Sequence, residues 1–187
     1  MSTIKIVISG IATLERVQRV VIVGNAGSGK STLARRLGER LGLPVVHLDA
    51  LSWEPGWRRV PVETLRSRLR AATSGDRWIT DGNYASCTFD LRLPRADLLI
   101  WVEQPRLHCV WRVMQRAVRS HFQTGEYLAP GCPERFNREL LDRLRFIVHF
   151  HRVNRPRIEE VRLRYGPDVP VLVLRGDAAI SGFADSA

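Results

Sequence analysis

The apolar residues of this chain form short unbroken runs and longer stretches in which they recur every three or four positions. Unbroken runs stand at residues 20–23 and 98–102. Such runs are typical of strands that are buried on both faces of a parallel sheet. Stretches with helical spacing follow them along the chain. The alternation predicts an α/β fold in which helices cover both faces of a parallel sheet.

Helix-ending residues and the spacing of apolar residues predict where the individual helices and strands lie. A glycine-rich turn follows the first strand and leads to a helix from Ser31 to Leu41, where Gly42 and Pro44 end the pattern. The other predicted strands cover residues 45–48, 78–80 and 169–174, and the other predicted helices cover 62–72, 136–152 and 156–165. Residues 4–8 add a candidate edge strand.

A long helix is predicted to begin at Pro105 and to be interrupted by a glycine- and proline-rich loop at 123–133. Its predicted core face consists of Leu107, Val110, Trp111, Met114 and Val118. A positive stripe of Arg112, Arg116 and Arg119 would lie opposite that face. Such a stripe is either a solvated helix surface or a site for negatively charged groups.

Length and composition favour one domain. The 187 residues suffice for a single core, so one domain over 1–187 is expected. The apolar runs fall far short of the ~20 residues that cross a bilayer. Cys87, Cys109 and Cys132 are widely spaced, which indicates neither a disulfide framework nor a zinc site. We expect a cytoplasmic protein without a membrane partner.

The strongest chemical signal is the sequence Gly-Asn-Ala-Gly-Ser-Gly-Lys-Ser at residues 24–31, which matches the Walker A pattern of a P-loop in full. Backbone N–H groups of such a loop surround phosphates at the positive end of a helix. The predicted nucleotide-binding residues are Gly24, Asn25, Ala26, Gly27, Ser28, Gly29, Lys30, Ser31 and Thr32. Lys30 would neutralise the β- and γ-phosphates and Ser31 would bind Mg²⁺, so Mg-ATP is the expected cofactor.

Two aspartates stand at the ends of predicted strands. Asp49 follows the strand at 45–48, and Asp81 follows Trp78-Ile79-Thr80. Because parallel strands end at one edge of the sheet, both carboxylates could face the P-loop. There they would bind Mg²⁺ or orient a phosphoryl acceptor, with Asp81 as the expected metal ligand beside Ser31. The alternative is that either aspartate only caps a loop.

These motifs resemble the adenylate-kinase-like group of nucleoside and small-molecule kinases. More narrowly, the chain resembles proteins called DNA topology modulation proteins over about residues 19–176. The segments that carry this likeness are 24–31, His47-Leu48-Asp49, Trp53-x-Pro-Gly-Trp57, Asp81-Gly82-Asn83-Tyr84 and 91–97.

The resemblance implies a five-stranded parallel sheet, an ATP site at the P-loop and an acceptor site beside Asp49 and Asp81. It also implies an acceptor-covering segment at about 50–75 and a short lid at about 119–135. Because arginines on a closing lid stabilise the charge of phosphoryl transfer, the resemblance favours Arg112 and Arg116 as catalytic residues. Arg175, after the last strand, would lie near the adenine.

The chain departs from adenylate kinases at the acceptor site. Those enzymes carry Asp-Gly-Phe-Pro-Arg where this chain has Asp81-Gly82-Asn83-Tyr84, so the arginine that binds the acceptor's phosphate is missing at that spacing. Arg92 or Arg95 could replace it. Trp53 and Trp57 are either packing residues or aromatic surfaces for a base or sugar.

Charge leaves a second hypothesis open. The formal net charge is +10, and residues 105–165 hold 13 arginines against six acidic residues. A basic surface attracts nucleic acids and phosphorylated small molecules alike. No recognised nucleic-acid-binding motif is present. The leading hypothesis is an ATP-dependent kinase acting on a nucleotide, nucleoside or other small acceptor. The alternative is an ATP-binding regulator that acts on nucleic acid.

Overall fold

The computed structural model describes residues 17–122 and 138–186, with side chains for all of these except 120–122. Five strands form one parallel sheet in the order β2-β5-β1-β6-β7. The alternating pattern predicted the parallel sheet, and the family resemblance implied its five strands. They are β1 Arg19–Gly24, β2 Val45–His47, β5 Trp78–Asp81, β6 Leu98–Glu103 and β7 Val171–Arg175. The candidate strand at 4–8 and the loop at 123–133 lie outside the described residues.

Helices cover both faces of this sheet. On one face, α1 (Lys30–Leu41) and α8 (Gly176–Ser186) bury the even-numbered residues of β1 and β6. On the other face, α4 (Ala85–Arg92) and α7 (Arg155–Tyr165) bury the odd-numbered residues of the same strands. This two-sided burial explains why β1 and β6 are continuous apolar runs. The face that carries α4 and α7 also carries α3 (Val62–Ala72) and a 3₁₀ turn, Leu93–Arg95.

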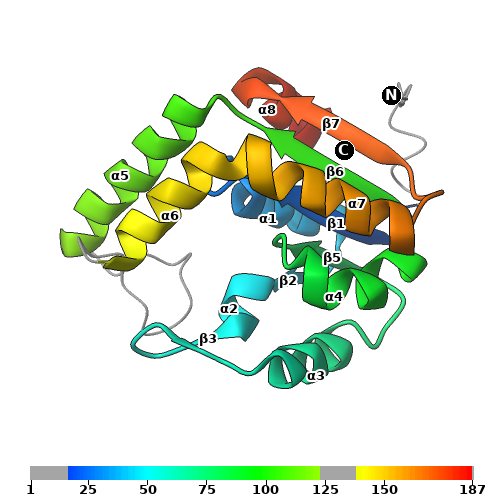
Figure 1. Cartoon of the computed structure of the whole chain (residues 1–187). Coiled ribbons are helices and arrows are strands. Elements are labelled where there is room, and N and C mark those ends of the chain that lie inside the picture. The colour runs from blue at the N-terminus through cyan, green and yellow to red at the C-terminus, as the bar shows by residue number, and fades with distance from the viewer. Residues whose placement is uncertain (1–16, 123–137, 187) are drawn as a thin grey trace.

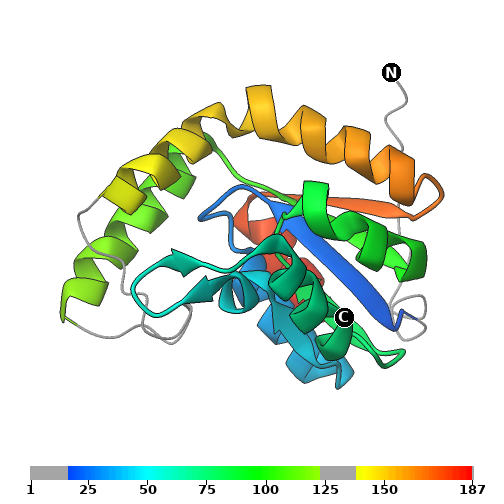
Figure 2. The ribbon, with the colours of Figure 1, turned by 60° about the horizontal axis from the view of Figure 1, so that its bottom comes forward.

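Beyond the carboxyl ends of the strands, α5 (Arg106–Phe122) and α6 (Arg138–His149) lie side by side and project away from the sheet (Figures 1 and 2). They bury a small separate core between them and against the P-loop. It consists of Cys109, Val113 and Ala117 from α5 and Leu140 and Ile147 from α6.

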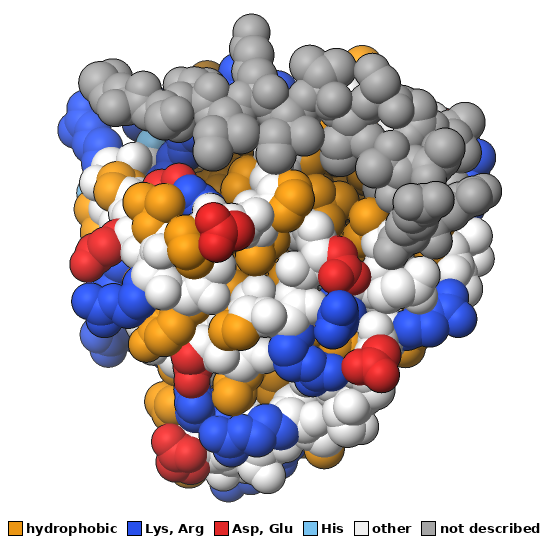
Figure 3. All heavy atoms as spheres, turned by 90° about the vertical axis from the view of Figure 1, so that its right-hand side faces the viewer, with side chains coloured by type: hydrophobic (Ala, Val, Ile, Leu, Met, Phe, Trp, Pro, Cys, Tyr) orange, Lys and Arg blue, Asp and Glu red, His pale blue; other side chains and the backbone are white. Residues whose placement is uncertain are grey.

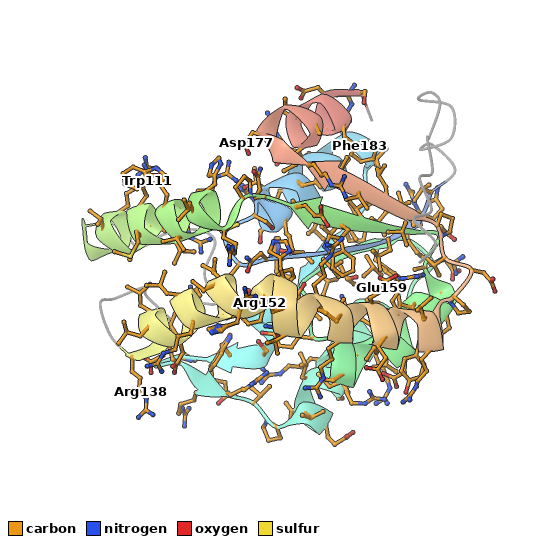
Figure 4. All side chains as sticks on the ribbon, turned by 45° about the horizontal axis from the view of Figure 1, so that its top comes forward. Trp111, Arg138, Arg152, Glu159, Asp177 and Phe183 are labelled. Carbon is orange, nitrogen blue, oxygen red and sulfur yellow. The ribbon has the colours of Figure 1, made fainter. Side chains whose placement is uncertain are left out.

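The predicted core face of α5 is confirmed for Val110 and Met114, which pack partly buried against this core. It is wrong for Leu107, Trp111 and Val118, which are exposed. Leu107 and Trp111 are 83% and 62% exposed, and Trp111 points away from α6 (Figure 4). The reason is that α5 extends past the sheet and buries its apolar side chains against α6 and the P-loop.

Arg112 and Arg116 each precede a buried residue of α5, Val113 and Ala117, and point about 100° away from it around the helix. Arg112 is accordingly half-buried and Arg116 is exposed.

One π-helical turn, Phe150–Asn154, joins α6 to α7. Such turns are rare and occur often at functional sites. Just before this turn, the carbonyl of Ile147 accepts a hydrogen bond of 3.1 Å from the Asn25 side chain, which is buried. The bond ties α6 to the P-loop.

The sequence pattern had not indicated five further elements. They are the short helix α2 (Leu48–Ser52), an antiparallel hairpin of β3 (Trp53–Glu54) and β4 (Arg58–Arg59), helix α4, the 3₁₀ turn that follows it, and α8. The hairpin lies beside the carboxyl edge of the sheet (Figure 2). None of the described helices is long and apolar enough to cross a membrane.

Candidate functional site

The P-loop connects β1 to α1 at the centre of the sheet and is packed tightly on two sides. Gly24 has a left-handed φ of 151°, and a Cβ there would lie 2.3 Å from the Val102 carbonyl oxygen. A Cβ on Gly27 would lie 2.6 Å from the carbonyl oxygen of Cys109 in α5. Only glycine fits these positions, because any side chain would collide with backbone atoms. The loop is thus held between β6 and α5.

The N-terminus of α1 is available to an anion. Within the described chain, no side chain caps this end, and its first turn contains no acidic residue. The N–H groups of Lys30, Ser31 and Thr32 belong to the first turn, where they have no intrahelical acceptor. The Lys30 ammonium donates a 2.8 Å hydrogen bond to the Asn25 carbonyl across the loop. Backbone donors, the helix dipole and a cation therefore meet at one place, which suits bound phosphates.

Asp81 lies next to this place because β1 and β5 pair with Ile22 opposite Asp81. Its side chain is buried, and Oδ2 forms a 2.9 Å contact with His47 Nδ1 at the end of β2. Burial would raise the pKa of Asp81, but the His47 hydrogen bond, the Lys30 charge and the Ser31 hydroxyl outweigh it, so the pKa is lowered. Asp81 is therefore an anion at neutral pH.

These groups fit a magnesium ion. Oδ1 of Asp81 is buried and makes no hydrogen bond to any group within the described residues. The Ser31 hydroxyl lies close enough to influence the same carboxylate. Hydroxyl and carboxylate oxygens beside a phosphate-binding loop are the ligand types that Mg²⁺ takes in such sites. Ser31 and Asp81 are thus the residues that would hold the ion.

Asp49 lies in the first turn of α2, directly after strand β2, and is exposed. The Tyr84 hydroxyl donates a 2.7 Å hydrogen bond to Asp49 Oδ1 and also lies 2.5 Å from the Ser52 hydroxyl. Burial and the neighbouring Asp49 charge raise the pKa of Tyr84, so the phenol keeps its proton. Asp49 therefore has one fixed oxygen and a second that the tyrosine does not engage.

Two arginines approach Asp49 from α5 and α6. Arg116 keeps an exposed surface, yet desolvation of its guanidinium lowers its pKa, with Asp49 opposing this shift and Arg112 adding to it. Burial likewise lowers the pKa of Arg143, with repulsion from Arg116 adding to the effect, while Asp49 opposes it. Positive charge is therefore concentrated opposite Asp49. Sequence reasoning missed Arg143, since nothing in the spacing of α6 singles it out.

Arg112 lies beside the P-loop itself. A Cβ on Gly29 would lie 3.3 Å from Arg112 Nη1, and Arg112 Nη2 donates a 2.8 Å bond to Asp177 at the start of α8. Gln104 donates a 2.6 Å bond to the same Asp177 oxygen. Figure 4 shows Asp177 next to the start of α5. Asp177 thus orients Arg112 toward the loop, a contact that no sequence pattern indicated.

The two tryptophans of the hairpin are in contact with each other and with arginines. The rings of Trp53 and Trp57 meet edge to face, with centroids 5.4 Å apart. The Arg143 guanidinium lies 5.0 Å from the centre of the Trp57 ring, and that of Arg59 lies 5.8 Å from the centre of Trp53. The hairpin is therefore linked to α6 near Asp49 through a cation–π contact.

Other arginines that the sequence singled out have different partners. Arg92 is fully buried and donates hydrogen bonds to the carbonyls of Gly82 and Asn83. Arg95 donates to the carbonyls of Thr73 and Gly75. The two arginines bind backbone, so neither replaces the missing arginine of the acceptor site. Arg175 is exposed at the end of β7 and pairs with Glu103 at 2.8 Å.

Comparison with known proteins supports the fold. One of 146 matching solved chains is a shikimate kinase from Acinetobacter baumannii in complex with shikimate. It superposes with a TM-score of 0.51 over 94% of this chain and 93% of that chain, at 17% sequence identity. The chain is thus a single-domain α/β protein that shares the fold of this neighbour, a five-stranded parallel sheet with helices on both faces and a P-loop. No protein-family model and no curated protein matches the sequence, so the narrower resemblance to DNA topology modulation proteins stays a prediction.

Proposed function

We propose that this protein is an ATP-dependent kinase that transfers the γ-phosphoryl group of Mg-ATP to a small acceptor. The observation that carries the proposal is the convergence of a complete P-loop, the buried anion Asp81 and the exposed Asp49 at one edge of the sheet. A P-loop alone would support nucleotide binding. Asp49, which accepts a hydrogen bond from Tyr84 and lies near Arg116 and Arg143, adds a carboxylate that can orient an acceptor hydroxyl.

Each residue has a defined role in this proposal. Backbone N–H groups of the P-loop and Lys30 bind the phosphates, while Ser31 and Asp81 would hold Mg²⁺, which supplies further charge neutralisation. Asp49 accepts the proton of the acceptor hydroxyl. Arg112 and Arg116 stabilise the negative charge that develops on the transferred group. Arg175 would contact the adenine, and residues 50–75 would cover the acceptor.

The arginines near Asp49 favour an acceptor with a negative group. A compound that carries both a hydroxyl and a carboxylate or phosphate would place its hydroxyl at Asp49 and its anion near Arg116 and Arg143. Shikimate, with which the structural neighbour was solved, is a hydroxy acid of this kind.

A coupled assay of ADP release tests the proposal. The assay would present nucleosides, nucleoside monophosphates, sugars, sugar phosphates and hydroxy acids, each with Mg-ATP. We expect one class of anionic acceptor to raise ADP release at least tenfold above the rate without acceptor. A protein that binds Mg-ATP but transfers phosphate to none of these classes would contradict the kinase proposal.

The second candidate, an ATP-binding regulator of nucleic acid, is favoured by the 13 arginines at 105–165. The placement of three of them speaks against it, because Arg112 lies beside the P-loop and Arg116 and Arg143 lie near Asp49. The face seen in Figure 3, which is turned away from α5 and the start of α6, carries both basic and acidic side chains outside the grey residues. A track for a nucleic-acid backbone requires a continuous positive groove.

Arginine substitutions separate the two candidates. Arg112→Ala and Arg116→Ala should each lower turnover at least tenfold, or about 1.4 kcal/mol of transition-state stabilisation. Arg106→Ala, an exposed position on the same helix, removes the same charge and should leave turnover unchanged. Steady-state kinetics with the best acceptor of the panel makes this comparison.

Fluorescence anisotropy with duplex and single-stranded DNA completes the separation. At physiological salt we expect weak binding that falls steeply with added salt and does not respond to ATP, as for unspecialised charge attraction. Submicromolar binding that ATP switches, together with unchanged turnover in both arginine variants, would favour the nucleic-acid regulator instead.

A further inference from the structure

The segment Gly82-Asn83-Tyr84 follows β5 and touches both halves of the candidate site. Its first contact is with the P-loop. Asn83 Oδ1 accepts a 3.0 Å hydrogen bond from the Gly24 N–H, and Asn83 Nδ2 donates a 2.9 Å bond to the Gly24 carbonyl. One side chain thus satisfies both backbone groups of the first P-loop residue, as a neighbouring strand would.

The second contact is with the candidate acceptor acid. Tyr84 donates to Asp49 Oδ1 and pairs with Ser52, as described above. Its backbone is left-handed, with a φ of 38°, a conformation that is costly for a residue with a side chain and persists only where the surroundings enforce it. The adjacent Gly82 has a φ of 135°, and a Cβ there would lie 3.0 Å from Leu48 Cβ. Close packing against α2 therefore fixes this turn.

The buried Arg92 stabilises this turn through hydrogen bonds to its backbone carbonyls. Its guanidinium donates to the Gly82 carbonyl at 3.0 Å and to the Asn83 carbonyl at 2.6 Å, and it lies 4.9 Å from the centre of the Phe89 ring. Burial lowers the pKa of Arg92 to about 9, so it still carries a charge at neutral pH. A planar fork can bind two neighbouring carbonyls at once, which an ammonium group cannot do in the same geometry.

We infer that Asn83 and Tyr84 are positioning residues that couple the P-loop to Asp49, with Arg92 fixing the turn that carries both. Binding of Mg-ATP restricts the P-loop, and Asn83 transmits this restriction to the next residue because it is bonded to both backbone groups of Gly24. Tyr84 then restricts Asp49 and helix α2. Ordering one site lowers the entropy cost of ordering the other. The catalytic meaning of this coupling rests on the proposed function, whereas the coupling itself requires only ATP binding.

Hydrogen–deuterium exchange with Mg-ATP as the probe tests the inference without a known acceptor. In the wild-type protein, Mg-ATP should slow amide exchange at least tenfold in peptides covering 24–32 and also in peptides covering 46–54. Tyr84→Phe removes only the hydroxyl and keeps the ring and backbone. This variant should retain the protection at 24–32 within twofold and lose the protection at 46–54.

Two further variants sharpen the test. Tyr165→Phe removes a hydroxyl from an exposed tyrosine on α7 and should behave as wild type in both peptides. Asn83→Ala should lose the protection at 46–54 and should also weaken Mg-ATP binding, because Gly24 loses both partners. Tyr84→Phe keeps the test decisive if Asn83→Ala does not fold.

The outcomes are distinguishable. Protection at 46–54 that persists in Tyr84→Phe would overturn the coupling, as would wild-type protection confined to 24–32. Neither result would affect the kinase proposal. Absence of protection at 24–32 in the wild type would overturn nucleotide binding and, with it, both proposals.

Discussion

Replacing Lys30 with alanine should lower phosphoryl transfer by roughly two to three orders of magnitude, the usual loss when a preorganised group that stabilises developing charge is removed. The ammonium lies across the P-loop, 2.8 Å from the Asn25 carbonyl, and within reach of the Asp81 charge. Backbone N–H groups would remain in the variant but carry no net charge. Steady-state kinetics and a fluorescent ATP analogue would measure the loss of turnover and the weaker binding.

The chain offers a matched control, because its only other lysine is Lys5. Lys5→Ala removes the same charge and should leave both measurements near wild type. Near-normal turnover in Lys30→Ala would remove the central claim that phosphates are processed at this loop.

The two aspartates should respond differently to substitution by asparagine. Asp49→Asn should lower turnover by about two to four orders of magnitude with little change in ATP affinity, because the group that accepts the acceptor's proton is lost while the P-loop is unaltered. Asparagine can still accept the hydrogen bond from Tyr84, so the local structure should persist. Turnover and ATP affinity measured on one preparation give the comparison.

Asp81→Asn should instead raise the Mg²⁺ concentration needed for half-maximal activity. Asp81 is buried between His47 and the P-loop. At this place a carboxylate binds Mg²⁺ more strongly than the neutral amide of asparagine would. A magnesium titration of both variants tests the assignment. The reverse pattern would exchange the two roles, and no effect in either variant would mean that both aspartates only cap loops.

The parts of the fold that are periodic or locally encoded could be predicted from sequence. The runs at 20–23 and 98–102 became the central strands because burial on both faces leaves no polar position in them. Helix α3 begins and ends at the predicted residues. The P-loop was recognisable because its glycines, Lys30 and Ser31 form one contiguous motif between a strand and a helix.

Features that depend on tertiary placement could not be predicted. Whether Leu107 faces a core is decided by where the sheet ends, which the spacing of α5 does not contain. Arg143 and Asp177 join the site from helices far along the chain, through contacts with Trp57 and Arg112. The β3–β4 hairpin has only two residues in each strand, too few for a visible alternation of apolar and polar positions.

Helix α8 gives the C-terminal end of the described chain a role in the order of folding. Ile180 and Ala184 belong to the core cluster around β1 and α1, and the Ala184 carbonyl accepts a hydrogen bond from Arg40. During synthesis, the apolar surface of β1 and α1 therefore stays partly uncovered until residues near 184 have left the ribosome. A parallel sheet with such distant contacts folds slowly, and a nascent chain in this state exposes surface that can aggregate. Tags or fusions are consequently safest where a linker separates them from residue 186.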